Sequence, residues 1–242
     1  MTRRVSFAIT FAALGFLASV AGAGAAPIAI NNFSFAAPAL SAGSWNFGTN
    51  AIPGWGAAYG ATADGVQAYT FGQYYTIPNS TQAMYVNYNG GQNGSYQDVG
   101  PLQANTTYTL SVYVGERADG LDGGYAGVSL LNGTDYRGAP LAFGYVLPSS
   151  MTPGFFQPLS LTYTTGGSVS GDLTIYLDQY LQSPFTTGDS QVSFADVTLD
   201  AAAASTGAVS VPDASPWALL TTGAAFALLL LRRRSPGRLL AR

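Results

Sequence analysis

Short runs in which apolar and polar residues alternate constrain this chain more than any other feature of its sequence. Leu173, Ile175 and Leu177 point to one side of a predicted strand, and residues 107–114 repeat the same period of two. A strand with one apolar face must bury that face against a second layer. No helical periodicity occurs between residues 26 and 200. The sequence therefore predicts an all-β domain over this range, built as a two-sheet antiparallel β-sandwich.

Further strands are expected where similar short runs are bounded by glycine and asparagine, at residues 28–35, 66–71, 83–88, 96–99, 126–130, 141–146, 159–163 and 191–199. In the last of these runs, Val192 and Phe194 have one parity, whereas Val197 and Leu199 have the other. A β-bulge at residues 195–196 would reconcile the two halves of this strand.

The composition excludes several classes of site. The chain has no Cys, His or Lys, so disulfides, a Ser-His-Asp triad and a lysine Schiff base cannot form. Residues 26–210 contain eleven acids and only two bases, Arg117 and Arg137. Because this excess of negative charge repels phosphate backbones, we expect no nucleic-acid partner.

The first 25 residues have the pattern of a secretory signal. Arg3 and Arg4 give a positive start, and an uncharged, mostly apolar run follows. Ala23 and Ala25 are the small residues that signal peptidase requires, and we expect cleavage after Ala25. The alternative is a permanent membrane anchor, for which the apolar run is short.

The C-terminal end has four parts in order: a flexible linker at 201–210, a Pro-containing motif at 211–216, a hydrophobic helix at 217–231 and a basic tail at 232–242. A helix of this length is marginal for crossing a hydrocarbon core about 30 Å thick. The positive-inside rule would keep the arginines in the cytoplasm and place the acidic domain outside.

This end of the chain resembles the PEP-CTERM sorting signal. The residues that carry the resemblance are Val211, Pro212, Asp213, Trp217, Arg232, Arg233 and Arg234, with Asp213 in place of the usual Glu. The resemblance implies processing by an exosortase-type enzyme, an inner-membrane anchor in transit, and a final location at the cell surface or outside the cell. The alternative is a plain tail-anchored surface protein.

The central region is similar to galactose-binding-like jelly rolls. The residues that carry this resemblance are Asn-Phe-Ser-Phe at 32–35, Ile-Pro-Gly-Trp at 52–55, Tyr-Gln-Asp-Val at 96–99 and Val-Ser-Phe-Ala-Asp-Val-Thr-Leu at 192–199. It implies a jelly roll that binds glycans without catalysis. It also implies a structural Ca²⁺ near Asp196, although Ala36 replaces the expected Glu ligand.

Aromatic residues beside amides suggest a sugar-binding surface, because a pyranose has an apolar face and a polar edge. The candidates lie in loop-like sequence: Trp45, Trp55, Tyr59, Tyr74, Tyr75, Asn87, Tyr88, Asn89 and Gln92. The alternative is structural, since Tyr suits β-strands and Trp55 would plug one end of the sandwich. Asp119 and Asp122 lie in a Gly-rich segment that would either bind Ca²⁺ or form a solvated turn.

These observations predict an exported, non-enzymatic surface or matrix protein that binds envelope or extracellular polysaccharide and needs no cofactor beyond a structural Ca²⁺. One alternative is a self-associating biofilm or sheath protein without a ligand. A second is a weak Asp-dependent glycan hydrolase, for which two suitably spaced carboxylates would be required.

Overall fold

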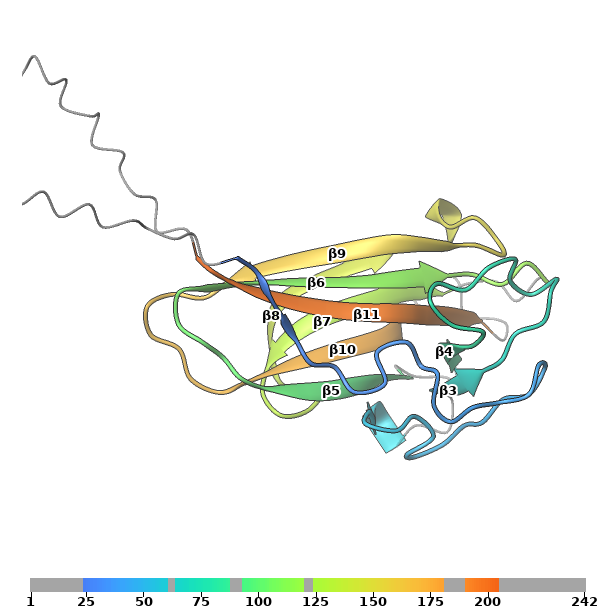
Figure 1. Ribbon diagram of the computed structural model, residues 1–242, viewed down its shortest axis with the longest axis horizontal. Helices are drawn as coiled ribbons and strands as arrows, with labels where there is room; N and C mark the ends of the chain where they lie inside the picture. The colour runs from blue at the N-terminus through green and yellow to red at the C-terminus, as the bar shows by residue number, and fades with distance from the viewer. Residues whose placement is uncertain (1–23, 61–63, 88–92, 120–123, 181–189, 205–242) are drawn as a thin grey trace, which may run out of the picture. The chain divides into compact units, whose positions relative to one another are not determined.

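The computed structural model describes residues 24–60, 64–87, 93–119, 124–180 and 190–204, which fold into two antiparallel β-sheets (Figure 1). The first sheet contains β1 (Ala26–Ile28), β3 (Asp64–Gln67), β4 (Ala83–Asn87), β6 (Thr106–Gly115), β9 (Phe156–Thr164) and β11 (Gln191–Ala203). The second contains β2 (Gly56–Ala57), β5 (Asn93–Pro101), β7 (Tyr125–Asn132), β8 (Ala139–Val146) and β10 (Asp172–Tyr180). Two short 3-10 turns, η1 (Ala58–Gly60) and η2 (Pro148–Ser150), complete the described elements.

The strand order in the first sheet is β3-β4-β11-β6-β9, with β1 added beside β11, and in the second it is β2-β5-β10-β7-β8. Both sheets are antiparallel throughout, which confirms the predicted all-β class and two-sheet architecture. The predicted helices of the signal and the sorting tail fall on residues 1–23 and 205–242, which lie outside the described residues. Nowhere in the described ranges is there a helix long and apolar enough to cross a membrane.

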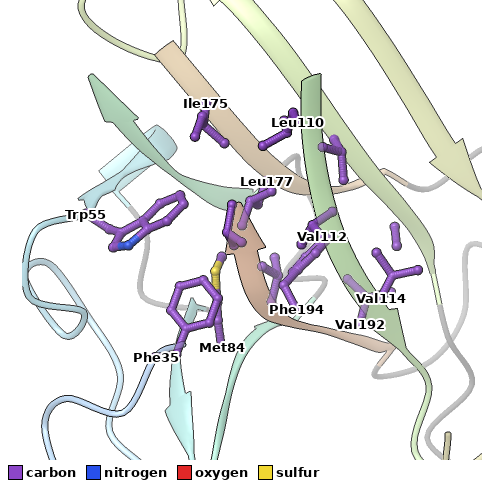
Figure 2. Close-up of a cluster of buried hydrophobic side chains, with 14 of the residues drawn as sticks. Phe35, Trp55, Met84, Leu110, Val112, Val114, Ile175, Leu177, Val192 and Phe194 are labelled. Carbon is purple, nitrogen blue, oxygen red and sulfur yellow. The ribbon is translucent and has the colours of Figure 1, made fainter. Parts of the chain in front are cut away.

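The alternating side chains meet between the sheets. Leu110 and Val112 point inward from β6 in the first sheet, and Ile175 and Leu177 point inward from β10 in the second (Figure 2). All four are buried, since each is at most 1% exposed. Each pair sits two residues apart on its strand, so the period of two puts all four on the inner faces.

The first strand ends earlier than the sequence predicts. β1 pairs with β11 only as far as Ile28, although the apolar run continues to Phe35. Asn32 and Phe35 have positive φ angles of 50° and 55°, which a strand cannot accommodate. The buried side chain of Gln97 replaces a strand partner, because it accepts a hydrogen bond from the Asn31 N–H at 2.8 Å and donates one to the Asn31 carbonyl at 3.1 Å.

The predicted bulge in the last strand is confirmed. The register of β11 against β6 shifts between Ala195 and Thr198. Asp196 lies in the shifted segment with a φ of 50°. The extra residue restores the inward orientation of Val197 and Leu199, both of which are 1% exposed.

Truncation of one core side chain should destabilise the fold strongly. Leu177 is fully buried, so Leu177→Ala removes apolar contacts and leaves a cavity. We expect a loss of about 2–5 kcal/mol in the free energy of unfolding, measured by urea denaturation. Phe143, which is 70% exposed on the outer face, provides the control. Phe143→Ala should change stability by about 0.5 kcal/mol or less.

Candidate functional site

The outer face of the second sheet brings one carboxylic acid between two glycines. Antiparallel register places Gly127 of β7 opposite Asp178 of β10, and Gly94 of β5 opposite Asp178 on the other side. Tyr145 of β8 lies opposite Gly127. Because residues directly opposite each other share a face, the four residues form one row across the sheet.

Aromatic rings cover the neighbouring part of this face. Tyr96 and Tyr176 lie opposite each other on β5 and β10, and the ring of Tyr136 packs over both, with centroid distances of 5.7 and 6.1 Å. Tyr59 packs on Tyr136 at 4.6 Å, and the guanidinium of Arg137 lies 4.7 Å from the centre of the Tyr136 ring. This aromatic layer closes one side of the surface and leaves the Asp178 side open.

The open side is a hollow of about 350 Å³. Its lining residues come from three adjacent strands: Tyr125, Gly127, Ser129, Pro140, Phe143, Gly144, Tyr145 and Asp178. Phe143 and Tyr145 stand well out from the sheet, 70% and 57% exposed, and the rings of Tyr125 and Tyr145 are 5.9 Å apart. Among the described residues, the hollow therefore has aromatic walls, glycines at its base and one acid, Asp178.

Burial controls the protonation of that acid. Asp178 is 9% exposed, and desolvation raises the pKa of its carboxyl to about 7, although its own backbone amide opposes the shift in part. Among the described residues, Tyr176 next to it on β10 and Tyr125 and Tyr145 in the hollow are the nearby titratable groups on this face, and no cation lines the hollow. A large fraction of Asp178 is therefore protonated near neutral pH and able to donate a proton.

A second buried acid lies outside the hollow. Asp64 of β3 is 2% exposed, and its Oδ2 accepts a hydrogen bond from the hydroxyl of Ser95. Ser95 lies opposite Leu177, so this pair faces the interior of the sandwich. Burial raises the pKa of Asp64 to about 6. Asp64 thus resembles Asp178 in its titration but does not line the hollow.

The predicted calcium ligands are engaged with other partners or lie outside the described residues. Asp119 forms an ion pair with Arg117, and the hydrogen bond that the Arg117 guanidinium donates lowers the pKa of Asp119. Asp196 accepts a hydrogen bond from the Asn79 amide at 2.6 Å. Asp122 is not among the described residues. Within the described ranges, no group of three or more acids assembles that could hold a metal ion.

The predicted sugar-binding residues do not converge on one surface. Trp55 and Tyr74 are each 4% exposed; the Trp55 indole donates to the Asn31 carbonyl at 2.9 Å and packs on Phe35, as the structural alternative expects. Trp45 is 61% exposed beside Gln67.

The remaining candidates are also separated. Tyr59 packs on Tyr136, whereas Tyr75 packs on Phe71 and Phe155 in another loop cluster. Asn87 accepts a hydrogen bond from Gln191 at 2.9 Å. The other three candidates, Tyr88, Asn89 and Gln92, lie outside the described residues.

Sequence reasoning missed the hollow. Asp178 lies near the end of a regular alternating strand, and its neighbours in the sheet, Gly127 and Gly94, are far away in the chain. A glycine inside a strand pattern often marks a close approach of another group to the backbone. Gly127, within the predicted strand 126–130, is the one signal in the sequence that pointed to this place.

Comparison with known proteins identifies enzymes that share this fold. A family model described as HpiC1-like, HpiC1 cyclase, matches residues 26–200. The Stig cyclase Fisc from Fischerella sp. TAU, crystallised with (3Z)-3-(1-methyl-2-pyrrolidinylidene)-3H-indole, is 25% identical, with a TM-score of 0.61 over 75% of this chain and 100% of Fisc. A second structure, of a cyclase from the same organism, is 26% identical, with a TM-score of 0.61 over 76% of this chain and 100% of that one. No curated protein matches the chain.

These matches overturn the predicted function. The expectation of a non-enzymatic polysaccharide-binding protein is wrong, because the matched family and both similar structures are cyclases. The absence of Cys, His and Lys excluded the usual nucleophiles and bases, but a buried Asp can act as an acid without them.

The sorting-signal assignment gains no support from the family match, which ends at residue 200; it falls on residues outside the described ranges and stays a prediction. Because the family model matches well over half of the residues of this chain, the chain belongs to the HpiC1-like cyclase family.

Proposed function

We propose that the protein is a cyclase in which Asp178 gives the proton that starts ring closure of an apolar substrate held in the outer hollow. The observation that carries this proposal is the position of Asp178: a 9% exposed acid, with its pKa raised to about 7, at the base of an aromatic-walled hollow. A general acid works best when its pKa lies near the working pH.

The chemistry is an isomerisation. The O–H bond of the Asp178 carboxyl breaks as its proton adds to one carbon of a substrate double bond, which leaves a cation on the neighbouring carbon. A second double bond of the same molecule attacks that cation and forms the new carbon–carbon bond. Loss of a proton to the Asp178 carboxylate restores the acid and the neutral product. No oxidant or reductant is consumed.

The walls of the hollow suit this reaction. The faces of aromatic rings attract cations, so Tyr125, Phe143 and Tyr145 would stabilise the positive charge that follows protonation. The similar Fisc structure holds a ligand that contains an indole ring. A hollow of about 350 Å³ with flat aromatic walls fits a substrate of that class.

Incorporation of deuterium tests the proposal. The purified protein would be incubated in D₂O with a panel of indoles that carry alkenyl chains at ring position 3, and the products analysed by chromatography and mass spectrometry. We expect an isomer of one panel member with one deuterium at the protonated carbon. Absence of any isomer, or an isomer without deuterium, would contradict the proposal.

Charge should control which ligands bind. Asp178 is the one charged residue among the described residues that line the hollow, and it ionises as the pH rises above its pKa of about 7. Indole-3-acetate should therefore bind at least about tenfold more weakly than neutral 3-methylindole, a difference of about 1.4 kcal/mol. Isothermal titration calorimetry measures both, and Asp178→Asn should reduce the difference. Equal affinities for the two ligands in the unmodified protein would place binding elsewhere.

A further inference from the structure

The side chain of Asp178 lies against a residue that has no side chain of its own. A Cβ atom at position 127 would overlap Oδ1 of Asp178 and would lie 2.9 Å from its Cγ. Real Cβ atoms essentially never approach another heavy atom so closely, so the carboxyl would have to move. The Asp178 carboxyl therefore occupies the space above the β7 backbone that any other residue at position 127 would fill.

Gly94 limits the strand from the other side. A Cβ there would overlap the backbone oxygen of Leu177 and would lie 2.9 Å from Cα and Cβ of Asp178, so the close approach of the β10 backbone requires glycine at this position. Both strands that flank β10 thus lack a side chain at the row of Asp178. Glycine weakens a strand, because it increases the entropy of the unfolded chain and packs against nothing. The backbone of β10 accounts for Gly94, whereas the three atoms nearest to a Cβ at position 127 all belong to the Asp178 carboxyl.

We infer that Gly127 is a positioning residue: its missing side chain leaves a slot that holds the Asp178 carboxyl flat on the sheet and turned into the hollow. The catalytic consequence of this inference rests on the proposed function, whereas the slot itself does not. Without the slot, the carboxyl must rotate away from β7. Once the carboxyl is outside the slot, water would solvate its ionised form. Asp178 would then no longer lie beside Tyr125 and Tyr145 in the hollow.

The titration of Asp178 tests the slot without any substrate. The ¹³C resonance of its carboxyl, assigned by its loss in Asp178→Asn, would be followed from pH 3 to 9 in the unmodified protein and in Gly127→Ala. We expect the pKa to fall by at least about one unit in Gly127→Ala, toward the ordinary value for Asp. Gly166→Ala is the matched control, because a Cβ there meets nothing within 4 Å, and it should leave the pKa unchanged.

A double-mutant cycle separates the slot from a general intolerance of alanine at position 127. Gly127→Ala should lower Tm in the unmodified protein but not in an Asp178→Ala background, where no carboxyl competes for the space. A variant that folds only in the Asp178→Ala background gives the same answer. An equal loss of Tm in both backgrounds, failure to fold in both, or an unchanged Asp178 pKa in Gly127→Ala would overturn the inference.

The two proposals can fail separately. If the pKa falls and the cycle shows coupling while no indole is cyclised, the positioning by Gly127 stands and the proposed function is wrong. If cyclisation occurs and Gly127→Ala leaves both the Asp178 pKa and the rate unchanged, the proposed function stands and the positioning role of Gly127 is wrong.

Discussion

Asp178→Asn should reduce the rate of cyclisation about 10²–10⁴-fold, the range that general acid catalysis contributes. Asn keeps the size of the side chain but has no acidic proton to donate. The binding of a neutral indole should change little, because the aromatic walls at Tyr125, Phe143 and Tyr145 remain. The measurement is kcat and KM for the isomer-forming substrate, in which the loss should fall on kcat.

Asp64→Asn is the matched control for this experiment. Asp64 is also a buried acid with a raised pKa, but it is bonded to Ser95 inside the sandwich and does not line the hollow. Its substitution should leave kcat within a few-fold of the unmodified protein. If Asp64→Asn removes activity while Asp178→Asn retains it, the assignment of the acid is wrong.

The two buried acids should also make the fold less stable as the pH rises. Each binds its proton more tightly in the folded chain than in the unfolded one, where the pKa is near 3.8. Their stabilising contributions are therefore complete below about pH 4 and are lost as the pH rises through the folded pKa values, about 6 for Asp64 and about 7 for Asp178. At 1.36 kcal/mol per pKa unit, the losses are about 3 and about 4 kcal/mol.

Urea denaturation of the variants at several pH values isolates each contribution. Asp178→Asn should gain about 4 kcal/mol relative to the unmodified protein between pH 4 and pH 8, because the neutral amide has no proton to lose. For Asp64→Asn the relative gain should be about 3 kcal/mol and should be complete about one pH unit lower. A relative stability of Asp178→Asn that stays constant with pH would show that Asp178 titrates as an exposed carboxyl.

Local pattern was enough to predict the sheets. The period of two in β6 and β10, and the break of parity in β11, depend on neighbouring residues only, so the sandwich and the bulge at Asp196 could both be predicted. The end of β1 could not be predicted, because the buried Gln97 side chain, 66 residues away, supplies the competing hydrogen bonds to Asn31.

The burial of the proposed acid, Asp178, depends on long-range pairing, which periodicity does not reveal. Asp178 is buried because β7 and β5 place glycines beside it, and the hollow needs Phe143 and Tyr145 from β8 as well. Aromatic residues in loops suggested a binding surface, but Trp55 is part of the core and Tyr75 packs in a separate cluster. Residue types excluded thiol, imidazole and lysine chemistry, whereas the register of the strands brought Asp178 beside Gly127 and Tyr145.

A crystal structure of the protein with (3Z)-3-(1-methyl-2-pyrrolidinylidene)-3H-indole, the ligand held by Fisc, tests the account most directly. We expect the indole ring to lie in the hollow beside Tyr125 and Tyr145, with a ligand atom about 3 Å from the Asp178 carboxyl. A ligand bound at another place, with the hollow at Asp178 filled by solvent alone, would contradict it.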